Sequence, residues 1–195
     1  MRQFFAALLL FALSGSAEAE EIASAYTEFD IDRDCAVTER ATEGEGTFSN
    51  YVCNGYRGFP VILSVDDMRE SIVYGFPGAD KTAWESFSGF NSAGPRIEWR
   101  LATYEGMELP FATIRRWFVN DPNEDDKKLE ILVVSKIGQP READGCVVGL
   151  VMATGKPDAN DMARIIADRQ ARDFACGADE RVFVGEPIPE FSRQD

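Results

Sequence analysis

The chain has 195 residues, of which 20 are Lys or Arg, 34 are Asp or Glu and none is His, so its formal net charge is −14. The absence of His excludes a Ser-His-Asp or Cys-His catalytic group, a His-ligated metal and a His proton shuttle. The negative charge argues against a nucleic acid as partner, because affinity for a phosphate backbone comes from clustered Lys and Arg.

The first 19 residues have the features of a secretory signal peptide. Arg2 supplies a positive charge, residues 4–13 are an unbroken apolar run, and Ala17 and Ala19 fit the small-x-small cleavage pattern. An N-terminal membrane anchor is the alternative, but the run holds 10 residues, whereas a spanning helix needs about 20. We therefore expect residues 20–195 to form one exported domain, periplasmic or secreted, with no membrane span.

The rest of the chain predicts strands joined by short turns. Apolar residues alternate over 59–65, a turn follows at Asp66 and Asp67, and residues 71–76 return as a second strand. Residues 76–95 form a long connection. Later strands are expected at 97–101, 111–119, 129–137, 146–153 and 181–185. Residues 146–153 are apolar on both faces and are therefore expected at the centre of the sheet.

One helix is predicted, over about residues 159–175. Asp158 or Asn160 can cap its N-terminus, and Gly177 suits the position just after its end. The helix has a smooth face of Ala residues four positions apart, which we expect to contact the sheet. A row of charged residues with the same spacing should face water. The Ala face holds Ala163, Ala167, Ala171 and Ala175, and the charged row holds Arg164, Asp168 and Arg172.

Four cysteines in an exported chain imply two disulfides, for which three connectivities are possible. The short spacings favour Cys35–Cys53 and Cys146–Cys176. A Cys₄ zinc site is the alternative, but the sequence has no CxxC pair. A redox role is disfavoured for the same reason, since thioredoxin-like motifs need two close thiols.

Metal and nucleotide motifs are incomplete. Asp30, Asp32 and Asp34 match the first ligands of an EF-hand, but Cys35 stands where Gly is required and Ala41 where a bidentate Glu is required. The acidic loop that starts at Asp121 fails in the same way, and no complete phosphate-binding Gly motif or GxSxG motif occurs. Because these motifs are incomplete, we predict no metal and no cofactor. A weak, irregular cation site in the acidic loops is the alternative.

The candidate binding residues are aromatic and cationic. Trp84, Phe87 and Phe90 lie in the 76–95 connection, and connections beyond about 12–15 residues are often functional. Trp is a typical interface anchor. A short helix with these rings in a satellite core is the alternative. Arg115 and Arg116 are further candidates, but neighbours on a strand face opposite ways, and ordinary salt bridges would also explain them.

The sequence therefore predicts a single exported α+β domain. An antiparallel meander of about six strands would carry one long C-terminal helix on one face and two disulfides. The leading hypothesis is a non-enzymatic binding or interaction protein whose acidic surface favours a basic protein partner, for example a secreted enzyme that it inhibits or an envelope protein. The alternative is a His-free hydrolase that acts on cell-envelope carbohydrate through two carboxylates. A structural envelope component is a third class.

Overall fold

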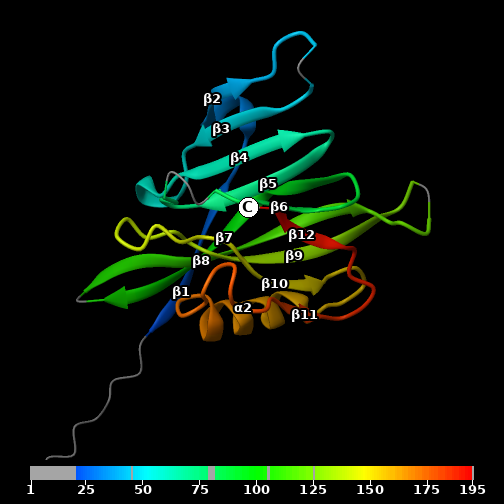
Figure 1. Cartoon of the computed structure of the whole chain (residues 1–195). Coiled ribbons are helices and arrows are strands. Elements are labelled where there is room, and N and C mark those ends of the chain that lie inside the picture. The colour runs from blue at the N-terminus through cyan, green and yellow to red at the C-terminus, as the bar shows by residue number, and fades with distance from the viewer. Residues whose placement is uncertain (1–20, 45, 79–81, 105, 125, 195) are drawn as a thin grey trace, which may run out of the picture.

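Figure 1 shows a computed structural model of the chain, which describes residues 21–44, 46–78, 82–104, 106–124 and 126–194. The predicted signal peptide, residues 1–19, lies outside the described residues. No helix of the described ranges is long and apolar enough to cross a membrane.

The largest sheet is built around a long hairpin. Its two strands, β7 and β8, each have 14 residues, and the remaining strands add on either side of them. Neighbouring strands are antiparallel, except that the last strand runs parallel to its neighbour. In order across the sheet, the strands are β1 (Ile22–Glu28), β7 (Asn91–Tyr104), β8 (Met107–Asn120), β9 (Lys128–Lys136), β10 (Val147–Met152) and β11 (Val182–Val184).

A second, four-stranded sheet comes from the first half of the chain, and a third has only two strands. The four-stranded sheet is an antiparallel meander of β2 (Cys35–Arg40), β3 (Ser49–Cys53), β4 (Val61–Asp66) and β5 (Arg69–Tyr74). The two-stranded sheet pairs β6 (Trp84–Phe87) with β12 (Phe191–Gln194) near the C-terminus. The helices are α1 (Ile31–Asp34), a 3₁₀ turn (Tyr56–Gly58) and α2 (Ala159–Gln170).

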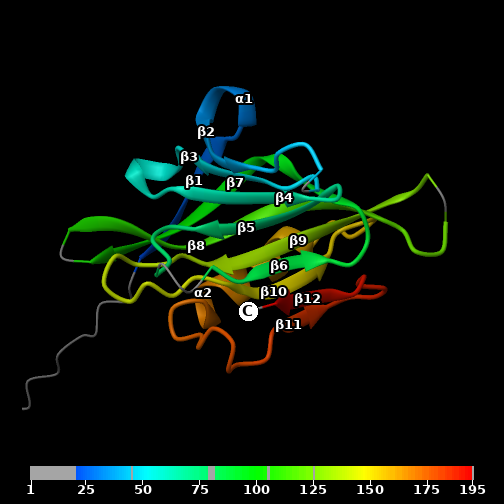
Figure 2. The same cartoon turned by 45° about the horizontal axis from the view of Figure 1, so that its top comes forward.

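The six-stranded sheet is covered on both faces, by the four-stranded sheet on one and by α2 on the other (Figures 1 and 2). Because successive side chains of a strand point to opposite faces, the middle sheet contributes apolar side chains to two cores, one on each face. Trp99 of β7 and Trp117 of β8 pack toward the four-stranded sheet, whereas Ala112 and Ile114 of β8 pack toward α2. The fold therefore has three layers, with the largest sheet in the middle.

The predicted fold class is wrong. The chain is mostly β, with 51% strand and 11% helix, and its strands divide among three sheets instead of forming one meander under a long helix. The helix ends at Gln170, and the 76–95 connection contains β6 and the start of β7. Alternation identifies a strand but carries no information about its sheet, because every half-buried strand has the same period of two residues.

Both predicted disulfides are confirmed. Cys35 and Cys53 lie directly opposite each other on β2 and β3, and they form one disulfide. Cys146, just before β10, is bonded to Cys176, which follows α2. The second disulfide therefore holds the chain beyond the helix against the middle sheet.

The predicted Ala face of α2 is confirmed for three of its four residues, whereas Ala175 is exposed and lies beyond the end of the helix. The prediction that the charged row faces water is wrong for Arg164 and Asp168, which pair with buried residues of β7. Ala163, Ala167 and Ala171 are fully buried against the sheet. Arg164 Nε lies 2.7 Å from Oε1 of Glu98 on β7, and Arg100 donates two hydrogen bonds to Asp168. These side chains reach down beside the helix because Glu98 and Arg100 occupy the same face of β7 and are buried there.

Replacing Ala167 by Leu should lower the free energy of unfolding by about 1–3 kcal/mol, because added volume in a filled interface forces side chains or backbone to shift. The control Gln170→Leu places the same side chain at an exposed position of α2 and should change it by less than about 0.5 kcal/mol. Urea unfolding midpoints measure both. An equally small shift for Ala167→Leu would mean that the helix packs by another face.

Candidate functional site

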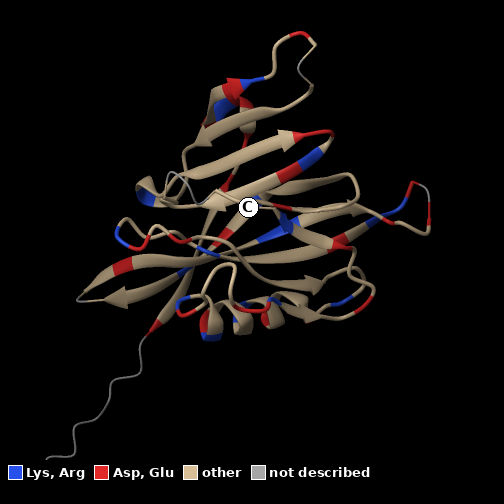
Figure 3. Ribbon diagram, viewed as in Figure 1, with Lys and Arg blue, Asp and Glu red and all other residues tan. Residues whose placement is uncertain are grey.

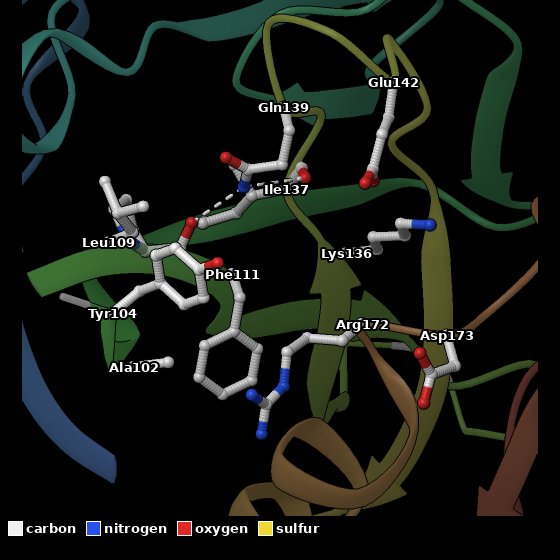
Figure 4. A pocket seen from close by; sticks show the side chains of 11 residues that line it. Ala102, Tyr104, Leu109, Phe111, Lys136, Ile137, Gln139, Glu142, Arg172 and Asp173 are labelled. Atoms are coloured by element: carbon white, nitrogen blue, oxygen red, sulfur yellow. Dashed lines mark hydrogen bonds between the residues drawn. The ribbon is translucent and has the colours of Figure 1, made fainter. Parts of the chain in front are cut away.

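A surface hollow of about 360 Å³ lies where the β7–β8 hairpin, the end of β9 and the end of α2 meet (Figure 4). Three separate parts of the chain supply its walls, so the fold alone brings them together. We call it the hairpin hollow. Its lining is Ala102, Tyr104, Leu109, Pro110, Phe111, Lys136, Ile137, Gln139, Glu142, Arg172 and Asp173.

One wall of the hairpin hollow is apolar and exposed. Tyr104 is 63% exposed and Leu109 is 39% exposed, and both line the hollow. Met107, which pairs with Tyr104 across the hairpin, is 58% exposed. These three side chains, the hairpin tip cluster, gather large apolar groups in one place. Clustered exposed apolar groups of this kind mark interaction sites more often than single ones do.

The cations of the hairpin hollow are already engaged by the protein. Lys136 Nζ donates to the carbonyl oxygen of Phe174 at 2.9 Å and lies 3.4 Å from a carboxylate oxygen of Asp144. The guanidinium carbon of Arg172 lies 4.8 Å from the centre of the Phe111 ring, a cation–π contact. Gln139 donates to the carbonyl oxygen of Pro110 at 2.9 Å. These contacts hold the walls of the hollow in place.

Two carboxylates complete the hairpin hollow, and neither is in an ion pair with a described residue. In the view of Figure 4, Glu142 and Asp173 both lie on the Lys136 side of the hollow, away from the aromatic rings. Both residues are exposed. The lining contains no Ser, Thr, Cys or His, so the chemistry that it offers is apolar contact, hydrogen bonding and negative charge.

The structure separates the three predicted aromatic candidates. Phe87 is 1% exposed and packs in the core against Trp117 and Phe191. Trp84 is half-buried and lines a hollow of about 570 Å³ on the outer face of the four-stranded sheet. Phe90 is exposed and lines another hollow of about 590 Å³. Val65 lines both hollows. Trp84 and Phe90 therefore lie in neighbouring hollows, whereas Phe87 lies in the core.

The two predicted arginines leave β8 on opposite faces, as expected. Arg115 is 3% exposed and lies between the sheets, where Nε donates to the carbonyl oxygen of Gly94 at 2.7 Å and the guanidinium lies over the ring of Phe29. Arg116 pairs with Glu130 of β9. None of the five candidates lines the hairpin hollow. Sequence reasoning missed that site because its residues approach only after β7, β8, β9 and α2 have assembled.

The space between the two larger sheets also holds polar groups. The hydroxyls of Tyr74 and Thr113 and one terminal nitrogen of Arg115 are buried without a hydrogen-bond partner among the described residues. Glu70 lies on the same strand as Tyr74, and its Oε2 accepts from the backbone N–H of Ala93. Burial raises the pKa of Glu70, and this outweighs the opposing effects of the Ala93 hydrogen bond and the Arg115 charge.

Comparison of the chain with known protein families, with curated proteins and with solved structures found no match. Within the described part of the chain, no group of three or more Cys, Asp or Glu side chains is placed to hold a metal ion.

Glu70→Gln should make the protein more stable than the wild type at pH 7, with the difference shrinking as the pH falls to about 4. A carboxyl group with a raised folded-state pKa contributes stability at low pH and loses it as the pH rises through that pKa. The Gln side chain can still accept from Ala93. Urea midpoints at both pH values test this, with the exposed Glu43→Gln as control. A Glu70→Gln variant that is less stable than the wild type at pH 7 would contradict the burial argument.

Proposed function

We propose that the protein is an exported, non-enzymatic binding protein that recognises a basic protein partner through the hairpin hollow and the hairpin tip cluster. The observation that carries this proposal is the exposure of Tyr104, Met107 and Leu109 together, beside a hollow of about 360 Å³. Two disulfides are compatible with export, since such bonds persist in oxidising compartments. The signal-like features of residues 1–19 support the same compartment.

The charge of the chain supports a basic partner. Acidic residues are distributed over loops of all three layers, and both signs of charge occur along α2 (Figure 3). A net charge of −14 attracts a positively charged protein over a distance of about one Debye length and repels a second copy of the chain. Apolar contact at the hairpin tip cluster would then supply most of the short-range affinity.

One observation favours a second candidate function, a His-free hydrolase that acts on cell-envelope carbohydrate. Glu142 and Asp173 share the hairpin hollow with the rings of Tyr104 and Phe111, and glycosidases act through two carboxylates. Incubation of the protein with purified peptidoglycan would test it, with the release of reducing ends as the readout. We expect no release above that of Glu142→Gln, whereas release that this substitution abolishes would favour the hydrolase.

The binding proposal predicts that Tyr104→Ser/Leu109→Ser will lose a partner that the immobilised wild type retains from envelope extract. Truncating an interface anchor typically costs 2 kcal/mol or more, about thirtyfold in affinity. Both side chains are exposed, so the unfolding midpoint should change little. Quantitative elution and urea unfolding measure the two effects.

Trp84→Ala is the matched control for this experiment. If the hairpin hollow is the binding site, this variant retains the partner and loses stability, because Trp84 is half-buried. Loss of the partner by Trp84→Ala at unchanged stability, with retention by the double variant, would place recognition in residues 76–95 and overturn the proposed site.

A further inference from the structure

Three hollows follow one another around the C-terminal end of α2. The hairpin hollow, about 360 Å³, shares Asp173 with a second hollow of about 380 Å³. That second hollow shares Phe174, Asp179 and Glu180 with a third, of about 570 Å³. Because neighbouring hollows share lining residues, they adjoin one another, and we call the three together the helix-end groove.

The floor of the third hollow holds two arginines that share one buried carboxylate. Glu85 of β6 is almost completely buried, and its Oε2 accepts from the backbone N–H of Val147 at 2.7 Å. Its Oε1 lies 2.5 Å from a guanidinium nitrogen of Arg181 and 3.7 Å from one of Arg193. The two arginines of this hollow therefore face a carboxylate of the protein, as Lys136 does in the hairpin hollow.

The carboxylates along the rim of the groove are different. Glu142, Asp173 and Glu180 are exposed, and none has a Lys or Arg nitrogen of a described residue within 4.0 Å. The second hollow is lined by Asp173, Asp179 and Glu180 and by no Lys or Arg, so the middle of the groove presents negative charge to a ligand. This complements a cationic segment and disfavours both a nucleic acid and a second copy of this acidic chain.

Apolar surface runs through the same groove. Tyr104 and Phe111 line its first hollow, and Phe183, which is exposed, lines its third together with Phe191. An extended peptide places successive side chains on opposite sides, with a rise of about 3.3 Å per residue. A segment that alternates apolar and cationic residues can therefore direct its apolar side chains into the hollows and its cations toward the rim.

We infer that the helix-end groove binds an extended segment of alternating apolar and Lys or Arg side chains in the partner protein. This inference rests on the proposed function and specifies the chemistry of the partner. The second hollow lies between the two aromatic ones and is lined by Asp173, Asp179 and Glu180, so at least one cation of the segment would bind there.

The probe is a fluorescein-labelled octapeptide of four Lys-Leu repeats, and fluorescence anisotropy measures its binding to the intact protein. We expect saturable binding in about 0.01 M salt that weakens in about 0.15 M salt, because the Debye length falls from about 30 Å to about 8 Å. Peptides of Lys-Ser and Glu-Leu repeats should each bind at least about tenfold more weakly, a difference of about 1.4 kcal/mol.

Two double variants separate the groove from the general charge of the protein. Asp173→Asn/Glu180→Gln neutralises two of the three rim carboxylates, and Asp32→Asn/Glu43→Gln removes the same charge from exposed positions in α1 and in the β2–β3 connection. The rim variant should bind the Lys-Leu peptide at least about tenfold more weakly and the control within about twofold of the wild type. Unfolding midpoints confirm that both variants fold.

Equal losses in the two double variants, or no saturable binding by the wild type, would overturn the inference. Failure of the proposed function is recognised separately. A partner from envelope extract that Tyr104→Ser/Leu109→Ser loses but Asp173→Asn/Glu180→Gln retains would leave the hairpin hollow as the binding site and exclude the longer groove. An extract in which the wild type retains nothing would count against the proposed function, whatever the peptide shows.

Discussion

The middle sheet must be apolar on both of its faces, and the rest of the structure depends on this constraint. Because the four-stranded sheet packs on one face and α2 on the other, β7, β8, β9 and β10 bury side chains in both directions. Trp99 and Trp117 fill one core, and the small Ala residues of α2 bring the helix close to the other face. The two cores share a single sheet, so the long β7–β8 hairpin contributes side chains to both.

Polar groups within these layers specify how the layers are placed. Glu98 and Arg100 of β7 are buried beside α2, where they pair with Arg164 and Asp168. Removing such charges from water costs several kcal/mol per ion, and their mutual attraction roughly offsets that cost. Their contribution is therefore to orientation more than to net stability: a helix that slid along the sheet would leave these charges buried without partners.

Local features of the fold were predictable from the sequence, whereas its long-range pairings were not. The spacings of Cys35, Cys53, Cys146 and Cys176 led to the correct disulfides, and the repeat of Ala163 and Ala167 led to the correct helix face. The pairing of β1 with β7 joins residues that are 68 positions apart at Glu28 and Arg96 and 80 apart at Ile22 and Ala102, and periodicity contains no signal for it. The helix pattern predicts that Arg164 faces water, because no feature of the sequence indicates that Glu98 lies beside it.

The hairpin hollow could not be predicted for the same reason. Its residues are ordinary in sequence, since Tyr104 and Met107 flank a turn and Arg172 follows a helix, and their approach is a property of the assembled layers. The aromatic candidates show the opposite case, in which residues close in sequence are separated by the fold. Trp84, Phe87 and Phe90 are adjacent in sequence, but β6 turns Phe87 into the core while Trp84 and Phe90 line two different hollows.

The pairing of β6 with β12 sets a condition on when this protein can fold. The strand Trp84–Phe87 has its only sheet partner in Phe191–Gln194, more than a hundred residues later within the described part of the chain. Glu85 is buried on that strand and depends on Arg181 and Arg193 for its countercharges. A chain that is still being synthesised lacks both the strand and the charges. The β6–β12 sheet and the ion pairs of Glu85 can therefore form only after the C-terminal residues have been made.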